Sequence, residues 1–146
     1  MHRVLIVDDH AYIRRGVQSI LSSSAEWQFC GEADSGNEAI RLADELNPEV
    51  IIMDVSMPGL NGVEAARQIR RRHPLIKILL LTLHESSELA STAFRAGVNG
   101  YLLKSDAEQE LVRALHAVLE DRTYVSPRFD NATLQRIFHN KNGASS

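Results

Sequence analysis

Two adjacent carboxylates, Asp8 and Asp9, follow the apolar run VLIV near the start of the chain. Asp54 follows a second apolar run, VIIM, Thr82 ends a third, KILLLT, and Lys104 follows a fourth, GYLL. Because each of these polar residues stands where a short apolar run ends, a parallel sheet would bring them to one edge. Any one of them alone is more simply explained as a helix cap or a solvated loop residue. Their matched positions favour a shared site.

Three carboxylates gathered in one shallow site would repel one another unless a cation lay between them. Mg²⁺ fits such a site, because it prefers hard oxygen ligands and usually binds one or two carboxylates together with phosphate oxygens. The charges of Mg²⁺ and Lys104 together would neutralise the acids. The six histidines are scattered through the chain without the spacing typical of zinc ligands. We therefore expect Mg²⁺ as the cofactor.

A carboxylate beside such cations can act as a nucleophile and accept a phosphoryl group as an acyl phosphate. Phosphoryl transfer needs mainly alignment and charge stabilisation, which Mg²⁺, an ammonium group and a hydroxyl group can supply. If Asp54 is the acceptor, its charge is replaced by roughly −2 on the phosphoryl group. The hydroxyl of Thr82 and the ammonium of Lys104 can then bond the new oxygens.

The elements that must position these residues follow from hydrophobic periodicity. Short apolar runs predict five strands, at residues 4–7, 27–31, 50–53, 77–82 and 100–103. Four of the runs are continuous rather than alternating, which is typical of strands buried on both faces of a parallel sheet. A segment with helical spacing follows each run. The sequence therefore predicts an α/β fold, a doubly wound five-stranded parallel sheet with five flanking helices.

Several helix ends can be predicted from capping patterns. Ser35 with Glu38 forms a capping box at the start of the second helix, and Ser105 with Glu108 is expected to form another at the start of the fifth. The arginines at 70–72 are expected to be solvated charges that complement the dipole at the end of the third helix. The turn GLNG at 59–62 gives flexible backbone beside Asp54.

Composition limits the class of protein. The 146 residues are 44% hydrophobic and 24% charged, as expected for one soluble globular domain. The net charge of −3 gives no general attraction to nucleic acid or to an anionic membrane. The chain opens directly on a strand pattern without a signal peptide, and its single cysteine, Cys30, cannot form an internal disulfide. We therefore expect a cytoplasmic protein without a membrane partner.

The character of the sequence changes after residue 121. We expect the folded domain to span residues 1–121 and residues 122–146 to be a linker. Within this linker, Leu134, Ile137 and Phe138 predict a short amphipathic helix, and the polar residues 140–146 predict a flexible tail.

The segments VDDH, VIIMDVSMPGLNG, LLLT and GYLLK, in this order, resemble the receiver domain of two-component response regulators. The resemblance covers residues 3 to about 121 and implies the flavodoxin-like (CheY-like) strand order 2-1-3-4-5. It implies that Asp54 is the phosphoacceptor. It also implies that the carboxylates of Asp9 and Asp54 and the main-chain carbonyl of Ser56 bind Mg²⁺, while Asp8 acts mainly through a metal-bound water.

The same resemblance assigns roles to the residues near the ends of the fourth and fifth strands. Thr82 and Lys104 match the switch hydroxyl and the phosphate-pairing lysine of the family. Tyr101 matches the aromatic residue that turns inward as Thr82 moves toward the phosphoryl group, although an aromatic at this position could also be simple packing. Ser105 stands where many receivers have proline, so a family cis peptide here would cost ~3 kcal/mol.

The resemblance also implies partners. A sensor histidine kinase would donate the phosphoryl group, and phosphorylation would favour a homodimer through either the fourth helix and fifth strand or the first and fifth helices. The DDH triplet, Ser105 and the segment RTYVSP are similar to the NarL/LuxR-type subfamily, whose members bind DNA through a C-terminal helix-turn-helix domain. Residues 123–146 are too few for that domain, so DNA binding would need a domain absent from this sequence. A stand-alone receiver is the alternative.

Two enzymatic or ligand-binding alternatives fit less well. An aspartyl phosphohydrolase commonly carries a second acid two residues after its nucleophile, where this chain has Ser56. A nucleotide-binding domain needs glycines after the first strand, where this chain has DDHAYIRRG. We therefore expect a phosphoacceptor domain rather than an enzyme that acts on an external substrate.

Overall fold

The computed structural model describes residues 1–143, with side chains up to residue 138. The strands are β1 (His2–Val7), β2 (Trp27–Ala33), β3 (Val50–Met53), β4 (Lys77–Thr82), β5 (Gly100–Leu103) and β6 (Tyr124–Val125). The α-helices are α1 (Ala11–Leu21), α2 (Gly36–Leu46), α3 (Gly62–Arg72), α4 (Ser87–Ala96), α5 (Ala107–Leu119) and α6 (Asn131–Gly143). None of these helices is long and apolar enough to cross a membrane.

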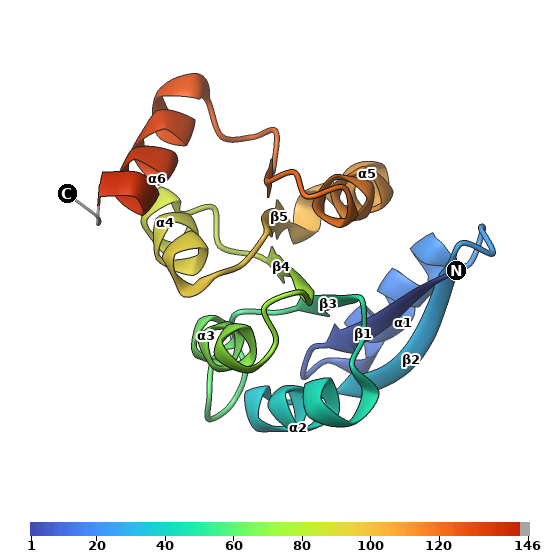
Figure 1. Cartoon of the computed structure of the whole chain (residues 1–146). Helices are drawn as coiled ribbons and strands as arrows, with labels where there is room; N and C mark the ends of the chain where they lie inside the picture. The colour runs from blue at the N-terminus through green and yellow to red at the C-terminus, as the bar shows by residue number, and fades with distance from the viewer. Residues whose placement is uncertain (144–146) are drawn as a thin grey trace.

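The strands form one parallel sheet in the order β2-β1-β3-β4-β5-β6 (Figure 1). The predicted order 2-1-3-4-5 is therefore confirmed, and a sixth strand extends it beyond β5. Helices cover both faces: residues of α1 and α5 pack into one apolar cluster, and residues of α2, α3, α4 and α6 pack into the other. The sheet is doubly wound as predicted.

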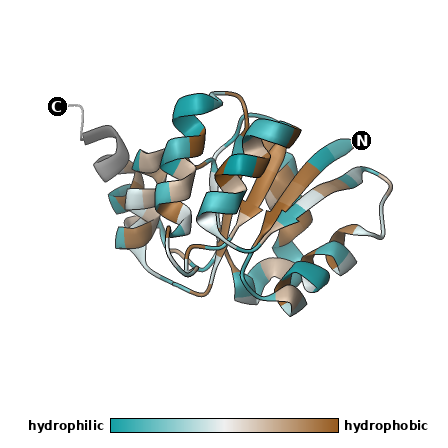
Figure 2. Cartoon of the chain, turned by 90° about the horizontal axis from the view of Figure 1, so that it is seen from below, coloured by the Kyte–Doolittle hydropathy of each residue, from teal (hydrophilic) through white to brown (hydrophobic). Residues whose placement is uncertain are grey.

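Alternation along the strands explains why the apolar runs are continuous. In β1, Leu5 and Val7 belong to the cluster under α2 and α3, whereas Val4 and Ile6 belong to the cluster under α1 and α5. Successive side chains in a strand point to opposite faces, so a strand covered on both faces must be apolar throughout. Figure 2 shows the resulting arrangement, with hydrophobic strands in the centre and hydrophilic positions on the outer helices.

The two predicted capping boxes have different outcomes. The Ser35 side chain accepts a hydrogen bond of 3.2 Å from the main-chain N–H of Glu38, which confirms the start of α2. The box predicted at Ser105 is wrong, because residues Lys104–Asp106 form a 3₁₀ turn and Asp106 is the residue before α5. The Asp106 side chain does not cap the helix, since its oxygens bond Ser126 and Arg128. The described chain contains no cis peptide bond.

The structure departs most from expectation after residue 121. Residues 122–143 do not leave the domain as a linker: β6 pairs with β5, and α6 packs against α4. Ile137 in α6 is fully buried. The predicted amphipathic helix is present, and it continues to Gly143, into the segment predicted as a tail from residue 140. Residues 144–146 of that tail lie outside the described residues.

Arg70 is also different from the solvated charge that its position in α3 suggested. Its side chain is half-buried and donates hydrogen bonds to the carbonyl oxygens of Gly97 (3.0 Å), His73 (2.9 Å) and Pro74 (2.9 Å). It also donates to the Asn99 side-chain oxygen at 2.8 Å, and burial lowers the pKa of this guanidinium. One side chain therefore joins the end of α3 to the loop that leads into β5.

We expect Arg70→Met to lower the free energy of unfolding by about 2–3 kcal/mol, because it leaves partly buried carbonyl groups without their charged donor. Urea denaturation measures the loss. Arg71→Met is the matched control, since Arg71 is an exposed residue of the same helix, and it should change stability by less than about 0.5 kcal/mol. Equal stabilities of the two variants would show that the Arg70 hydrogen bonds contribute nothing.

Candidate functional site

The predicted acids lie together at the carboxyl ends of the central strands. Val7 pairs with Met53 at the ends of β1 and β3, so the residues that follow, Asp8 and Asp54, are neighbours. The Asp54 main-chain N–H donates to the Val7 carbonyl oxygen at 2.9 Å, which extends the strand pairing into the site. Both acids are buried, at 2% and 5% exposure for Asp8 and Asp54. The two acids are therefore held next to each other with little access to water.

Lys104 lies between these two carboxylates. Its ammonium nitrogen is 3.0 Å from Asp8 Oδ2 and 3.5 Å from Asp54 Oδ1, and its side chain is only 11% exposed. The pairing of Thr82 with Leu103 at the ends of β4 and β5 brings Lys104 to this edge. One buried cation thus faces two buried anions, and the pair of acids is left with an uncompensated negative charge.

The surroundings of Asp54 raise the pKa of its carboxyl group. Burial is the largest cause that raises the pKa of Asp54, and the Asp8 carboxylate raises it further. The Lys104 ammonium and the main-chain N–H of Ser56 lower the pKa of Asp54, but they do not offset burial. An additional cation, or a change of the charge on Asp54, would therefore alter the balance of the whole site.

The residues after β1 fit a hard divalent cation. Asp9 Oδ1 is buried and has no hydrogen-bond partner among the described residues. His10 Nδ1 is 3.1 Å from this atom, but their orientation does not make a hydrogen bond. A buried oxygen atom without a hydrogen-bond partner, beside the Asp8 carboxylate, is the kind of ligand that Mg²⁺ prefers.

His10 was missed as a neighbour of the acids. Its main-chain N–H donates to Asp8 Oδ1 at 2.9 Å, and its ring Nδ1 is 3.3 Å from the same oxygen. Asp8, Asp9 and His10 form a group that could hold a metal ion. The six histidines are therefore not all remote from the site, and the adjacency of His10 to the acid pair in DDH was the available signal.

The two predicted switch residues meet at the main chain of His84. The Thr82 hydroxyl oxygen accepts a hydrogen bond of 3.1 Å from the His84 N–H, and the Tyr101 hydroxyl donates to the His84 carbonyl oxygen at 2.6 Å. Both side chains are fully buried, and burial raises the pKa of Tyr101. Tyr101 thus occupies an inward position, connected to Thr82 through one residue of the loop between β4 and α4.

The side chain of His84 makes a further contact near the site, with Ser56. The Ser56 hydroxyl and His84 Nε2 share a hydrogen bond of 2.8 Å, and both residues are exposed. This bond joins the loop after β3, which begins at Asp54, to the loop after β4. The role predicted for the Ser56 main-chain carbonyl as a metal ligand stays a prediction.

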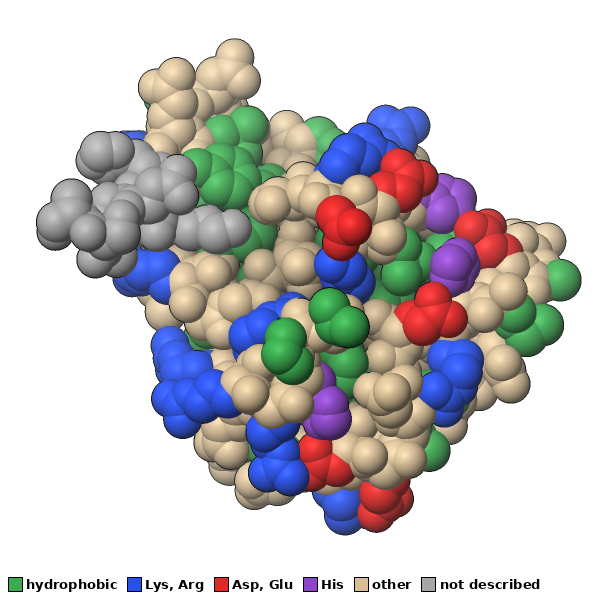
Figure 3. All heavy atoms as spheres, viewed as in Figure 1, with side chains coloured by type: hydrophobic (Ala, Val, Ile, Leu, Met, Phe, Trp, Pro, Cys, Tyr) green, Lys and Arg blue, Asp and Glu red, His purple; other side chains and the backbone are tan. Residues whose placement is uncertain are grey.

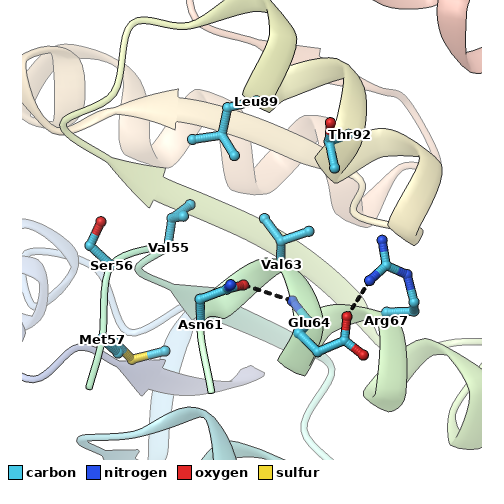
Figure 4. A pocket seen from close by; sticks show the side chains of 9 residues that line it. All are labelled: Val55, Ser56, Met57, Asn61, Val63, Glu64, Arg67, Leu89 and Thr92. Carbon is cyan, nitrogen blue, oxygen red and sulfur yellow. Dashed lines mark hydrogen bonds and ion pairs between the residues drawn. The ribbon is translucent and has the colours of Figure 1, made fainter. Parts of the chain in front are cut away.

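A cavity of about 430 Å³ opens beside the site, between the loop after β3 and helices α3 and α4 (Figure 4). Its lining includes Ser56 but none of the three acids. The Asn61 side chain caps α3 by accepting from the Glu64 N–H at 2.9 Å, and Glu64 pairs with Arg67 at the rim. The cavity is therefore a neighbour of the charged cluster and not part of it.

Acidic and basic side chains are both distributed over the face shown in Figure 3, in line with the small net charge of −3. The strand order and the acids at the strand ends define the class of protein: a doubly wound α/β domain with a carboxylate cluster at its carboxyl edge that could hold a cation.

Comparison with known proteins assigns the family within this class. Residues 4–116 match the model of the response regulator receiver domain, and the chain belongs to this family. It is 41% identical over 128 residues to the response regulator GacA of Pseudomonas viridiflava, covering 88% of this chain and 60% of that protein. It is 38% identical over 126 residues to the response regulator UvrY of Escherichia coli, covering 86% of this chain and 58% of that protein.

Solved structures agree with this assignment. A LuxR-family two-component response regulator from Aurantimonas sp. SI85-9A1 matches with a TM-score of 0.85 and 35% identity, over 97% of this chain and 99% of that one. The receiver domain of a NarL response regulator from Mycobacterium tuberculosis matches with a TM-score of 0.77 and 34% identity, over 83% of this chain and 98% of that one. The predicted NarL/LuxR-type receiver is confirmed, and the chain spans about 60% of the GacA protein.

Proposed function

We propose that this receiver domain is a phosphorylation-controlled switch in which Asp54 accepts a phosphoryl group from a phosphohistidine of a sensor kinase. The observation that carries the proposal is the position of Lys104, 3.0 Å from Asp8 and 3.5 Å from Asp54. In the transfer, an Asp54 oxygen forms a bond to phosphorus while the bond from phosphorus to the kinase histidine nitrogen breaks. The Lys104 ammonium stabilises the charge that moves onto the phosphoryl oxygens.

Asp9, Asp54 and the main-chain carbonyl of Ser56 would bind Mg²⁺, with Asp8 as an outer partner, and the ion would neutralise charge on the transferred group. The buried Asp9 Oδ1 without a hydrogen-bond partner supports this ligand set. We infer that the chain is a phosphoacceptor rather than an enzyme that acts on external esters, because Ser56 stands where an aspartyl phosphohydrolase commonly carries its second acid.

The structural response to phosphorylation would involve Thr82 and Tyr101. Once Asp54 carries a phosphoryl group, the Thr82 hydroxyl can bond its oxygens instead of accepting from His84, and Tyr101 is held inward by the same loop. Transcription is the proposed consequence, through a DNA-binding domain outside this sequence. A Brevibacillus brevis relative, transcriptional regulatory protein DegU, is 35% identical over 126 residues and supports this proposal. Kinase and receiver would meet in the cytoplasm.

A homodimer on phosphorylation would use the face of α1 and α5. The alternative dimer face, formed by α4 and β5, is covered by the chain itself, because α6 packs on α4 and β6 pairs with β5. The α1 and α5 face carries an open groove and keeps Tyr12 63% exposed. These two observations favour the second of the two dimer surfaces that the sequence left open.

Intact-protein mass after incubation with a small acyl phosphate tests the proposed function. We expect one added phosphoryl group that requires both Mg²⁺ and Asp54, and no addition to Asp54→Asn. The control is Asp34→Asn, a change of an exposed acid after β2, which should be phosphorylated like the wild type. A folded wild-type protein that gains no mass, or a variant at position 54 that gains it equally, would reject the acceptor role.

The bond between Ser56 and His84 predicts the lifetime of the phosphoryl group. Because it joins the loop after β3 to the loop after β4, we expect His84→Ala to loosen these loops, admit water to Asp54 and speed phosphoryl loss by about threefold to tenfold, the range of one ordinary hydrogen bond. The decay of the phosphorylated mass with time measures this rate. Ser56→Ala should have the same effect, and the double variant should decay no faster than either single one. Equal decay in all four proteins would contradict a role for the bond.

A further inference from the structure

Residues 124–138, the C-terminal segment, are packed directly on the switch tyrosine. We infer that docking of this segment on β5 and α4 is linked to the inward position of Tyr101, so that phosphorylation of Asp54 and docking strengthen each other. The claim that phosphorylation of Asp54 strengthens docking rests on the proposed function. The link between docking and Tyr101 rests on the contacts alone.

The C-terminal segment is hydrogen-bonded to Tyr101 and to residues before and after it. The Tyr124 N–H donates to the Asn99 carbonyl at 3.1 Å, and the Ser126 N–H donates to the Tyr101 carbonyl at 2.9 Å. The Ser126 hydroxyl accepts from the Leu103 N–H at 3.3 Å and donates to Asp106 Oδ2 at 2.5 Å. The segment is thus tied to the residues that precede and follow Lys104.

The ring of Tyr101 carries the second connection. It meets the ring of Phe129 edge-on, with centroids 5.9 Å apart and an angle of 65°, and Tyr101 is fully buried. Its hydroxyl donates to the His84 carbonyl, and the His84 N–H donates to Thr82. A continuous series of contacts therefore runs from the Thr82 hydroxyl to the C-terminal segment.

The same packing makes docking and the outward position of Tyr101 incompatible. A buried ring cannot turn toward solvent while Phe129, itself only 8% exposed, lies against it. If the Tyr101 ring turned outward, it would therefore have to displace the segment. If the segment undocked, Phe129 would no longer cover the Tyr101 ring, and one of the contacts that hold this ring inward would be lost. A coupling of this kind is reciprocal, so each event changes the equilibrium of the other by the same factor.

The helix α6 fixes the far end of the segment through its packing on α4. Ile137 is fully buried in the cluster under α4, and the rings of Phe138 and Phe94 lie 5.5 Å apart. Phe129 and Phe138 thus have separable roles. Phe129 connects the docked segment to Tyr101, whereas Phe138 contributes to docking itself.

Site-resolved amide hydrogen exchange in the 146-residue chain tests the inference. Exchange in residues 131–138 is compared without ligand and with Mg²⁺ plus beryllium fluoride, a phosphoryl mimic. We expect the mimic to slow this exchange by at least about fivefold, the lower end of typical coupling between sites. Phe138→Leu should speed exchange of α6 in both states and keep the ratio between them. Phe129→Leu should reduce the ratio, because its contact with Tyr101 is weakened.

The outcomes separate this inference from the proposed function. If acyl phosphate adds mass at Asp54 but exchange of α6 does not respond to the mimic, the function stands and the inference is overturned. If no mass is added, the proposed function fails. Hydrogen exchange of the His84 N–H without any ligand then tests whether docking of the segment is linked to Tyr101. Faster exchange there in Phe138→Leu than in the wild type would support the link to Tyr101, and equal exchange would overturn it.

Discussion

Asp54→Asn is expected to raise the free energy of unfolding at neutral pH by about 1 kcal/mol, although it removes the proposed phosphoacceptor. The Asp54 carboxylate is 5% exposed and shares the single Lys104 ammonium with the buried Asp8. Burial and the negative charge of Asp8 raise the pKa of Asp54, so ionising it in the folded protein is unfavourable. Asparagine keeps the shape of the side chain and removes the charge.

The raised pKa of Asp54 also gives the pH dependence. The folded protein binds this proton more tightly than the unfolded chain, so the stability that the proton provides is fully present below the unfolded pKa. It is lost as the pH rises through the folded pKa. The wild type should therefore lose stability relative to Asp54→Asn across that interval, and the two proteins should converge in acid.

Urea denaturation at a series of pH values without Mg²⁺ measures this difference. Asp34→Asn is the matched control, because it removes an exposed charge that follows β2 and should leave stability nearly unchanged. Mg²⁺ should narrow the gap between wild type and Asp54→Asn, since a cation that binds only the folded acids stabilises the wild type. A variant less stable than the wild type at neutral pH would show that the buried charges are already compensated.

The charged cluster could be predicted from the sequence, because each strand end is marked by the change from an apolar run to a polar residue. In a parallel sheet the residues after each strand must share an edge, so Asp8, Asp54 and Lys104 could be placed together without any coordinates. The main-chain connection through His84 could not be predicted in this way. It depends on where a loop places a carbonyl and an N–H, and every residue carries both groups.

The C-terminal segment was missed for a different reason. The strand β6 has only the residues Tyr124 and Val125, which is too short for a periodic signal. Its place depends on contacts distant in sequence, such as Ser126 with Leu103. Arg70 was likewise assigned to solvent because a basic residue at a helix end usually is solvated. Its partners Gly97 and Asn99 come from another part of the chain.

Gly62→Ala is expected to lower the free energy of unfolding by about 3 kcal/mol or more and to reduce phosphoryl incorporation at Asp54. Gly62 is the first residue of α3, and its N–H donates to the Val55 carbonyl at 2.8 Å. A Cβ atom at this position would lie 2.0 Å from the Asp54 carbonyl oxygen and 2.9 Å from Val55 Cα. These atoms belong to the main chain of the loop that joins β3 to α3, called the acceptor loop after the role proposed for Asp54, so they cannot move aside as a flexible side chain does.

Gly16→Ala makes the same chemical change where the space is open, and it is the control for this prediction. Gly16 is an exposed residue inside α1, and a Cβ atom there would meet nothing within 4 Å. We expect this variant to be more stable than the wild type by about 0.5–1 kcal/mol, because alanine is the better helix former. The glycines with positive φ are Gly59 and Gly97, and Gly62 is not one of them. The stability lost in Gly62→Ala must therefore come from the contact with the Asp54 main chain and not from backbone strain. Urea denaturation and intact-protein mass after treatment with acyl phosphate measure both variants. If Gly62→Ala retained wild-type stability and phosphorylation, the acceptor loop would have to be free to move away from α3, and its role in fixing Asp54 would be rejected.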